Sequence, residues 1–374
     1  MRILLLGDYS GVHYNLSVGL KALGHDVTLA SGGDSWKNYP RDIDLKRELT
    51  FKGRLSFILR LAGFLLKMRN FDVVQLINPV FIHLKAERIR WVYDYIRKYN
   101  KNVVLAVFGD DYYLPALHSR KKLLRFCDFY TDGKEKWSDW AKLVYKEWIG
   151  TPKERLSRYV ASTCDHIVAG TYEYWLPYYL SEDSSENGKL LKEKLTCIPF
   201  PFIVEEVPVM DGHKTIRIFV GLLKDRAKFK GTDVMLKAAT DLKKKYPGIV
   251  EVISVEGLPY SEYKSVISCS DILLDQMWSY CPGMNALLAM SNGVICFSGG
   301  EPEHYDIIGE NKCRPIINVE PSYSGVYQKL EWLILHPELI PELKRQSREY
   351  VIRNHDHIKV AKQYEALYNQ LMNK

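Results

Sequence analysis

Residues 271–303, DILLDQMWSYCPGMNALLAMSNGVICFSGGEPE, decide the fold of this chain. The apolar run that ends at Asp275 predicts a buried parallel strand, and a loop then leads into a short helix over residues 284–292. A second apolar run at 294–297 predicts the next strand, and a glycine pair opens another loop. Both loops follow the carboxyl ends of strands in one βαβ unit, which is where doubly wound sheets bind their ligands.

The two loops of this unit resemble a motif of the family 4 glycosyltransferases, which have the GT-B fold. In that family a strand is followed by E-G-F-G, a helix that ends in E-A-M-A-x-G, a second strand and G-G-x-P-E. The two carboxylates of the family's E-x7-E signature are missing here, because their positions hold Tyr280 and Leu288. The residues in register with the pattern are Gly283, Ala289, Met290, Gly293, Gly299, Gly300, Glu301, Pro302 and Glu303.

The resemblance extends over most of the chain in pattern and implies an α/β protein of the GT-B class, with two Rossmann-like domains facing across a cleft. We expect residues 1–202 to form an acceptor domain and residues 215–354 a donor domain, joined by a linker at 203–214. A terminal helix at 355–374 is expected to pack back on the first domain. Length and composition agree, since 374 residues suit two domains and 47% apolar residues suffice for two cores.

Charge and cysteine content restrict the classes of partner. The net charge of +7 permits an anionic partner, but the cations are spread over both halves, so nucleic acid is not expected. The seven cysteines are scattered without a C-x-x-C pair or a metal-like cluster, which indicates thiols in a reducing cytoplasm. No apolar stretch of about 18 residues occurs, and the first apolar run is too short for a signal peptide.

The chain opens with a predicted strand at 3–6, a small-residue loop at 7–11 and a helix at 12–23. The loop is not G-x-G-x-x-G and no acidic residue closes the second strand, so a nicotinamide dinucleotide is only weakly indicated. In the family that the chain resembles, this loop faces the donor sugar and the acceptor, which makes Gly11 a donor-binding candidate. His13 is either a polar group of the active cleft or a capping or solvated residue at the helix end.

Residues 53–69, GRLSFILRLAGFLLKMR, are apolar with interspersed cations and no acid. The wider region 37–69 holds nine lysines and arginines against three acids. Such a segment either lies as an amphipathic helix on an anionic membrane surface or is a core-facing helix with a solvated basic edge.

Gly109-Asp110-Asp111 follows a predicted strand at 102–108 and matches the G-x-D of the family that the chain resembles. Asp110 is therefore a candidate for binding or positioning the acceptor hydroxyl, and ordinary turn chemistry is the alternative. The aromatic stretch 112–160 either lines an acceptor groove or packs around a pair of helices. The polar segment 181–188 predicts a mobile loop.

In the second half, GLLKDRAKFKGTDVML at 221–236 resembles the family's G-R-x5-K-G-x-D-x-L. Lys230 aligns with the lysine of that pattern, and Lys224 lies near the position of its arginine. Two cations between a strand and a helix suit a diphosphate that accepts charge as the sugar leaves. A solvated basic loop is the alternative, because Arg226 and Lys228 are also present.

Backbone amides at the amino end of the helix that starts at residue 284 favour a diphosphate. Asp275, Gln276 and Glu303 are candidates to replace the missing carboxylates. We expect Lys224, Lys230, His13 and Asp110 to act in catalysis and Gly11, Gly283, Met284, Asn285, Tyr280, Gly300 and Glu303 to bind the donor, without a metal.

We therefore predict a glycosyltransferase that moves a sugar from a nucleotide-diphosphate sugar to a hydroxyl acceptor, either a carbohydrate or a lipid-linked one. The resemblance implies retention at the anomeric carbon, no cofactor, and a role in bacterial surface polysaccharide or glycolipid synthesis, in the cytoplasm or on the inner face of the membrane. A nucleotide-sugar epimerase and a non-catalytic protein that binds nucleotide sugar or a partner enzyme are the alternatives.

Overall fold

The computed structural model describes residues 1–34, 37–47, 50–120, 122–131, 134–135, 137–206, 215–222 and 230–374. The chain divides into two compact units. Unit 1 consists of Met1–Lys121, Lys142–Pro201 and His357–Lys374, and unit 2 consists of Lys122–Ala141 and Phe202–Asp356. The linker expected at 203–214 falls mostly outside the described residues.

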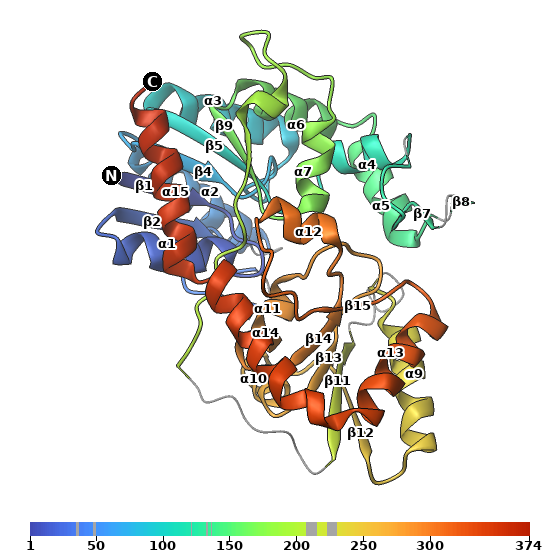
Figure 1. The fold of residues 1–374 in the computed structure, drawn as a ribbon. Helices are drawn as coiled ribbons and strands as arrows, with labels where there is room; N and C mark the ends of the chain where they lie inside the picture. The colour runs from blue at the N-terminus through green and yellow to red at the C-terminus, as the bar shows by residue number, and fades with distance from the viewer. Residues whose placement is uncertain are drawn as a thin grey trace. The chain divides into compact units, whose positions relative to one another are not determined.

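Unit 1 is built on a seven-stranded parallel sheet in the order β10-β9-β5-β4-β1-β2-β3 (Figure 1). The strands are β1 (Arg2–Leu6), β2 (Asp26–Ser31), β3 (Ile43–Asp44), β4 (Val73–Leu76), β5 (Asn102–Val107), β9 (His166–Ala169) and β10 (Leu195–Cys197). The central strands are short runs of buried residues, as expected for a parallel sheet covered on both faces. In register, Leu4 of β1 lies between Thr28 of β2 and Val74 of β4.

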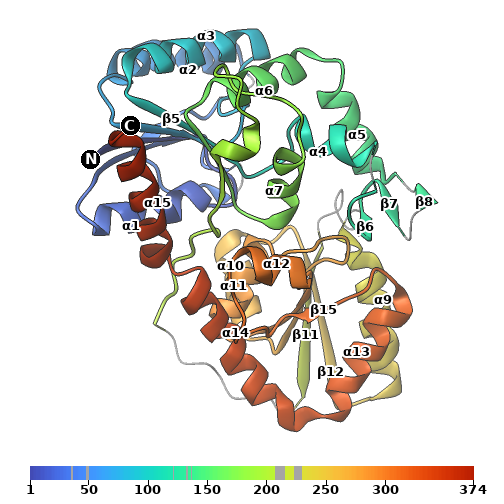
Figure 2. The ribbon, with the colours of Figure 1, turned by 45° about the horizontal axis from the view of Figure 1, so that its top comes forward.

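Helices cover both faces of this sheet, with α1 and α15 side by side on one face and α2, α3 and α6 on the other (Figure 2). Gly19 permits the close packing of α1 on α15, since a Cβ there would lie 2.3 Å from the carbonyl oxygen of His357. The helices are α1 (Val12–Ala22), α2 (Phe51–Lys67), α3 (Ala86–Tyr99), α4 (Tyr113–His118), α6 (Pro152–Thr163), α7 (Tyr172–Tyr179), the 3-10 helix η2 (Leu191–Lys194) and α15 (His357–Met372). A further helix, α5 (Asp139–Trp148), spans the boundary between the units.

Unit 2 carries a five-stranded parallel sheet in the order β12-β11-β13-β14-β15. The strands are β11 (Ile216–Leu222), β12 (Val250–Glu256), β13 (Ile272–Leu274), β14 (Ile295–Ser298) and β15 (Ile317–Asn318). The helices are α9 (Thr232–Lys245), α10 (Tyr260–Ser268), α11 (Met284–Ser291), α12 (Pro302–Ile307), α13 (Tyr323–Leu335), η3 (Pro337–Leu339) and α14 (Ile340–Asn354). One core cluster joins the strands to α9 and α13, with Ile218, Met235 and Leu330 fully buried in it.

Residues 122–141 differ from expectation, because they leave unit 1 and pack in unit 2. They form a small antiparallel sheet of β6 (Phe126–Cys127), β7 (Tyr130–Thr131) and β8 (Lys134–Glu135) (Figure 2). The sequence did not indicate strands here, because the stretch 112–160 was expected either to line an acceptor groove or to pack around a pair of helices. The physical reason is a long-range contact, since the Phe126 and Tyr280 rings lie 5.1 Å apart between centroids. The expected domain at 1–202 is therefore interrupted.

Strand order reverses once around the first strand of each sheet. In unit 2 the chain runs from β11 to β12 on one side and then to β13 on the other side of β11. The equivalent reversal in unit 1 lies between β1 and β4. Loops at the carboxyl ends of such strand pairs form the crevices in which open α/β sheets bind ligands. Among the described residues, no helix is both long and apolar enough to cross a bilayer.

Candidate functional site

The charged centre of the candidate site lies at the strand reversal of unit 2. Asp275 directly follows β13, and its side chain is 1% exposed. The Nζ of Lys230, just before α9, donates to Oδ1 of Asp275 at 3.2 Å. Asp275 also accepts from Nδ2 of Asn285 at 3.0 Å and from Oγ of Ser298 at 3.2 Å. Residues far apart in the sequence therefore meet on one buried carboxylate.

This network fixes the position of the lysine ammonium. A buried carboxylate is stable only when it is paired and hydrogen-bonded, and Asp275 meets both conditions. Lys230 keeps 23% of its side chain exposed, so a ligand at the strand ends can contact the ammonium. Its expected partner Lys224 lies outside the described residues, as do Arg226 and Lys228.

Backbone conformation and close packing both require glycine at position 231. Gly231 has a φ of 72° at the amino end of α9, in the left-handed region that favours glycine. A Cβ there would lie 2.7 Å from Cε of Met277. The backbone N–H of Met277 donates to the carbonyl of Lys230 at 2.9 Å. This hydrogen bond joins the segment before α9 to the loop after β13.

The amino end of α11 offers backbone N–H groups beside this network. Gly283 precedes the helix with a φ of −88°, makes no side-chain cap, and a Cβ built on it meets nothing within 4 Å. A small residue thus leaves the helix start open, where the helix dipole favours an anion. Met284 is the first helical residue, and the Asn285 side chain is oriented by the Tyr263 hydroxyl, which donates to its Oδ1 at 2.8 Å.

The Gly299-Gly300 loop is shaped by contacts with the neighbouring loop. A Cβ on Gly299 would lie 2.0 Å from the carbonyl oxygen of Ser279. The N–H of Gly300 donates to Oδ1 of Asn318 at 3.1 Å. Gly300 therefore helps to maintain the conformation of the loop, and its N–H group is already hydrogen-bonded within the protein.

Tyr280 does not present its hydroxyl in the way we expected for a donor-binding residue. The side chain is buried, and its hydroxyl oxygen accepts the backbone N–H of Arg125 at 2.6 Å. Burial raises the pKa of Tyr280 to about 12, so the phenol stays neutral. Leu288, at the other carboxylate position, is buried inside α11. Neither side chain carries a carboxylate, and the Tyr280 hydroxyl is engaged by the Arg125 backbone.

Two other carboxylates lie beside Tyr280. The guanidinium of Arg125 pairs with Glu301 and lies 3.5 Å from Oε1 of Glu303. Glu303 was expected at the site, whereas Arg125 was not. Local pattern gives no signal for Arg125, because it belongs to the inserted segment 122–141 and lies 155 residues before Tyr280.

His13 lies in the core of unit 1, which corrects both expectations for it. Its Nδ1 contacts the carbonyl oxygen of Gly7 at 2.7 Å, and its Nε2 contacts Nε2 of Gln75 at 3.1 Å. Burial lowers the pKa of His13 to about 3, so the ring is neutral, with Nδ1 donating and Nε2 accepting. Both ring nitrogens are therefore occupied by the protein, and His13 holds the loop after β1 in place.

Gly11 also shapes the loop after β1. It has a φ of 77°, and a Cβ on it would lie 2.6 Å from the Tyr39 ring. Its conformation, together with this close contact, requires glycine.

The acidic pair after β5 divides into two roles. Asp111 is buried, accepts the Tyr178 hydroxyl at 2.5 Å and the Tyr113 N–H at 2.8 Å, and burial raises its pKa to about 7. Asp110 is partly exposed at the carboxyl edge of the sheet, and its carbonyl accepts Nδ2 of Asn78. Only Asp110 of this pair therefore stays a candidate for contacting the acceptor.

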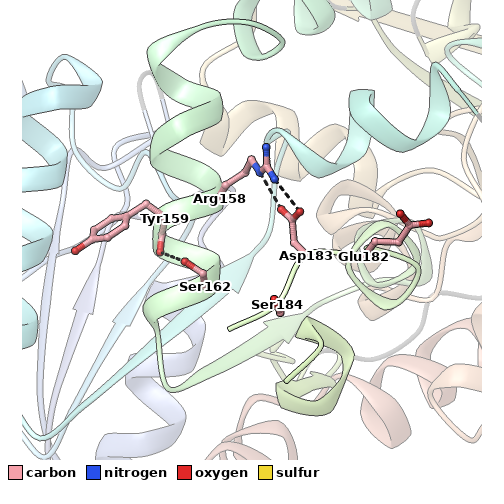
Figure 3. A pocket seen from close by; sticks show the side chains of 6 residues that line it. All are labelled: Arg158, Tyr159, Ser162, Glu182, Asp183 and Ser184. Atoms are coloured by element: carbon pink, nitrogen blue, oxygen red, sulfur yellow. Dashed lines mark hydrogen bonds and ion pairs between the residues drawn. The ribbon is translucent and has the colours of Figure 1, made fainter. Parts of the chain in front are cut away.

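A pocket of about 360 Å³ lies elsewhere in unit 1 (Figure 3). Arg158 and Asp183 line it and pair through two hydrogen bonds of 3.0 and 2.9 Å. Arg158 and Asp183 thus neutralise each other, which leaves Glu182 as a further acidic side chain in the lining. They also fasten the segment 181–188, which we expected to be a mobile loop. The other lining residues are Tyr159, Ser162, Glu182 and Ser184.

No protein-family model and no curated protein matches the sequence. Solved structures match it over nearly the whole chain. Sucrose-phosphate synthase from Thermosynechococcus elongatus is 14% identical with a TM-score of 0.60, covering 100% of both chains. Anabaena HepE (Alr3699), solved with UDP and glucose, is 11% identical with a TM-score of 0.58, covering 99% of this chain and 100% of its own.

A third match is UDP-GlcNAc 2-epimerase from Neisseria meningitidis bound to UDP-GlcNAc, which is 12% identical with a TM-score of 0.52 and covers 99% of this chain and 100% of its own. At such identities the likeness shows the fold alone. The chain therefore has the GT-B fold with two Rossmann-like domains, as the pattern of residues 271–303 predicted.

Proposed function

We propose that the protein is a glycosyltransferase that moves a sugar from a nucleotide-diphosphate sugar to a hydroxyl acceptor. The observation that carries the proposal is the Lys230–Asp275 ion pair at the strand reversal of unit 2, beside the open amino end of α11. A fixed ammonium and backbone N–H groups beside the same strand reversal suit a diphosphate.

Lys230 and the amides of α11 would act on the negative charge that develops on the leaving diphosphate during transfer. The bond between the anomeric carbon and the diphosphate oxygen breaks, and a bond forms between that carbon and the acceptor oxygen. The acceptor hydroxyl loses its proton, and the leaving diphosphate gains negative charge. Donors that are already in place stabilise that charge more in the transition state than in the ground state. Lys230 is held in place by the buried Asp275 carboxylate, so little reorganisation is needed.

The finer parts of the proposal rest on the resemblance to family 4 glycosyltransferases. They are retention at the anomeric carbon, transfer without a resident metal or cofactor, and a role in bacterial surface polysaccharide or glycolipid synthesis at the cytoplasmic side. Asp110 is the proposed contact for the acceptor hydroxyl, since it is the partly exposed acid after β5.

Two alternatives share the fold. A nucleotide-sugar epimerase is one, since the Neisseria meningitidis epimerase has the same architecture. A protein that binds nucleotide sugar without transferring it is the other, because Tyr280 and Leu288 stand at the carboxylate positions.

The test begins with thermal stabilisation by a panel of UDP- and GDP-linked sugars, since a ligand that binds the native state raises its stability. The stabilising donor is then incubated with candidate acceptors. The transferase proposal expects free nucleoside diphosphate together with a glycosylated product. An isomerised nucleotide sugar identifies an epimerase, and binding without either product identifies a binding protein.

Helix α2 supports a second proposal, that the protein docks on an anionic membrane surface. Its inner side buries Phe57 and Phe64, yet Ile58, Leu59 and Leu66 on the outer side are 53, 65 and 71% exposed. Lone exposed apolar residues are common, but a helix that is apolar on both sides calls for a partner.

The charges around α2 favour an anionic bilayer as that partner. Residues 53–69 contain no acid, and Lys52 and Lys67 are exposed at the two ends of the helix. Arg60 is used within the protein, since its guanidinium donates to the carbonyls of Asp44 and Lys46. The exposed apolar side with cations at both ends matches an interfacial helix.

Vesicle co-sedimentation tests this proposal. Vesicles with anionic lipid are expected to bind the protein better than neutral ones, and the double change Leu59→Ser and Leu66→Ser is expected to abolish binding. Leu335→Ser on α13 is the matched control, because that leucine is also exposed but lies in unit 2. Equal binding to neutral and anionic vesicles, or unchanged binding by the double variant, refutes the proposal.

A further inference from the structure

A chain of buried hydrogen bonds joins the terminal helix α15 to the loop after β1. The Tyr368 hydroxyl of α15 donates to Oε1 of Gln75 in β4 at 2.7 Å, and Nε2 of Gln75 lies 3.1 Å from Nε2 of His13 in α1. Nδ1 of His13 lies 2.7 Å from the carbonyl oxygen of Gly7. The three side chains are fully buried, and they come from three separate elements of unit 1.

The chain allows one arrangement of its protons. The carbonyl oxygen of Gly7 can only accept, so Nδ1 of His13 donates to it. Because burial lowers the pKa of His13 to about 3, the ring is neutral, and its Nε2 accepts from the side-chain amide of Gln75. The carbonyl oxygen of that amide accepts from the Tyr368 hydroxyl. Each bond therefore sets the direction of the next, from the terminal helix to the loop.

The chain ends on the peptide group that opens the loop of residues 7–11. Gly7 has a φ of 78°, and its own N–H donates to the carbonyl of Ala30 at 2.9 Å. In a trans peptide the C=O and N–H groups point in opposite directions, so the N–H of Asp8 points away from His13. This loop lies at the strand reversal of unit 1, where open α/β sheets bind ligands.

Pairing the Gly7 carbonyl does not by itself require the whole chain. A buried carbonyl oxygen needs one donor, and His13 supplies it. Gln75 and Tyr368 bring further polar atoms into the core, where an unpaired polar atom costs stability. A fully paired network, in contrast, fixes one arrangement of the groups that it joins. What these two residues add is a fixed orientation of the His13 ring and, through it, of the loop.

We propose that Tyr368 and Gln75 are positioning residues that act through His13 on the loop after β1, which makes the terminal helix α15 part of the machinery of transfer. This inference rests on the proposed transferase function. Neither residue touches the substrate in this account. Misplacement of a reacting group by about 1 Å can nevertheless lower turnover about 100-fold, so a residue that only orients a binding loop still affects the rate.

The experiment records NMR spectra of the full chain with nitrogen-15 in its histidine rings and backbone. In the wild type, His13 is expected to carry a proton on Nδ1 and none on Nε2. In Tyr368→Phe, the amide signals of residues 8–11 are expected to shift, because the Gln75 amide loses the donor that orients it. Turnover is expected to fall about 10- to 100-fold, the effect of a displaced reacting group. The affinity for the nucleoside diphosphate, which is proposed to bind in unit 2, is expected to stay unchanged.

Tyr93→Phe is the matched control, because it removes another fully buried tyrosine hydroxyl of unit 1, which lies 2.8 Å from Oγ1 of Thr163 and outside the chain. It is expected to lower the melting temperature and to leave the loop signals and turnover unchanged. Gln75→Met breaks the chain at a second point with a side chain of similar size. It is expected to shift the same loop signals as Tyr368→Phe.

Two results overturn the inference. One is a loss of stability in Tyr368→Phe and Gln75→Met with the loop signals and turnover of the wild type. The other is a wild-type His13 with its proton on Nε2, a result that needs no variant. A wild type that transfers no sugar from any nucleotide sugar refutes the proposed function instead, and the loop signals of the variants still decide whether Tyr368 and Gln75 position the loop.

Discussion

The ammonium of Lys230 lies 3.2 Å from a carboxylate oxygen of Asp275, across the point where strand order reverses in unit 2. The carboxylate is almost fully buried and the ammonium is not. This asymmetry makes the aspartate a positioning residue and the lysine the group that meets a ligand.

The first prediction concerns stability. Lys230→Met is expected to destabilise the protein, because it leaves a buried carboxylate without its cation. Breaking a buried pair costs about 3–5 kcal/mol, and the loss here is smaller because Asn285 and Ser298 still donate to Asp275. The double variant Lys230→Met with Asp275→Asn is expected to regain most of that loss. Urea unfolding of both variants measures the difference, and an equally unstable double variant contradicts it.

The second prediction compares two glycines that lie at the amino ends of α9 and α11. Gly231→Ala is expected to destabilise by about 1–3 kcal/mol, since φ is 72° and Met277 is too close. Gly283→Ala is expected to leave stability unchanged, because its backbone is extended and its Cβ meets open space. That methyl group would instead obstruct an anion at the start of α11. Gly231→Ala is therefore expected to lower the melting temperature. Gly283→Ala is expected to keep the melting temperature and to weaken nucleotide affinity.

The third prediction is a pH dependence from Asp111, whose pKa is raised to about 7 by burial. Between about pH 4 and pH 7 the folded state keeps the Asp111 proton, whereas the unfolded state has lost it. The contribution of Asp111 to the free energy of unfolding therefore falls as pH rises from about 4 to about 7, and it is constant above about pH 7. Asp111→Asn keeps an oxygen for the Tyr113 N–H. The stability of the wild type relative to this variant is expected to fall over that pH window, and a difference that does not vary with pH contradicts the assignment.

The fourth prediction concerns the terminal helix. Gly19→Ala is expected to loosen α15 from α1, because the added methyl lies 2.3 Å from the His357 carbonyl and overpacking typically costs about 1–3 kcal/mol. Hydrogen exchange of the α15 amides is expected to accelerate. Gly63→Ala on α2 is the control, since its Cβ meets nothing and alanine favours a helix. Similar exchange in both variants would show that Gly19 does not limit this packing.

The strands and the glycine loops were predictable because their signals are local. A run such as residues 102–107 reads as a buried strand from its composition alone, and the Lys230-Gly231 pair stands before its helix as the pattern indicated. Asp275 is a candidate from the sequence because it lies near the positions of the missing carboxylates, and the structure instead pairs it with Lys230.

The surroundings of Arg125 and His13 could not be predicted, because they depend on contacts between residues that are distant in the sequence. The sequence places Arg125 in an aromatic stretch and gives no sign that it meets Tyr280 and Glu301. His13 starts a helix, and only the fold shows that Gly7 and Gln75 enclose its ring. A polar residue at a helix start looks the same from local pattern whether it is buried or exposed, so the sequence left its role open.

The most direct test of the central claim is the rate of transfer from the preferred nucleotide sugar by the double variant Lys230→Met with Asp275→Asn. This variant removes the proposed diphosphate cation without leaving a buried charge. Turnover is expected to fall about 10²–10³-fold, as for the loss of one transition-state donor. Lys237→Ala, which removes an exposed lysine of α9, is expected to leave the rate unchanged. A double variant that turns over at close to the wild-type rate contradicts the account.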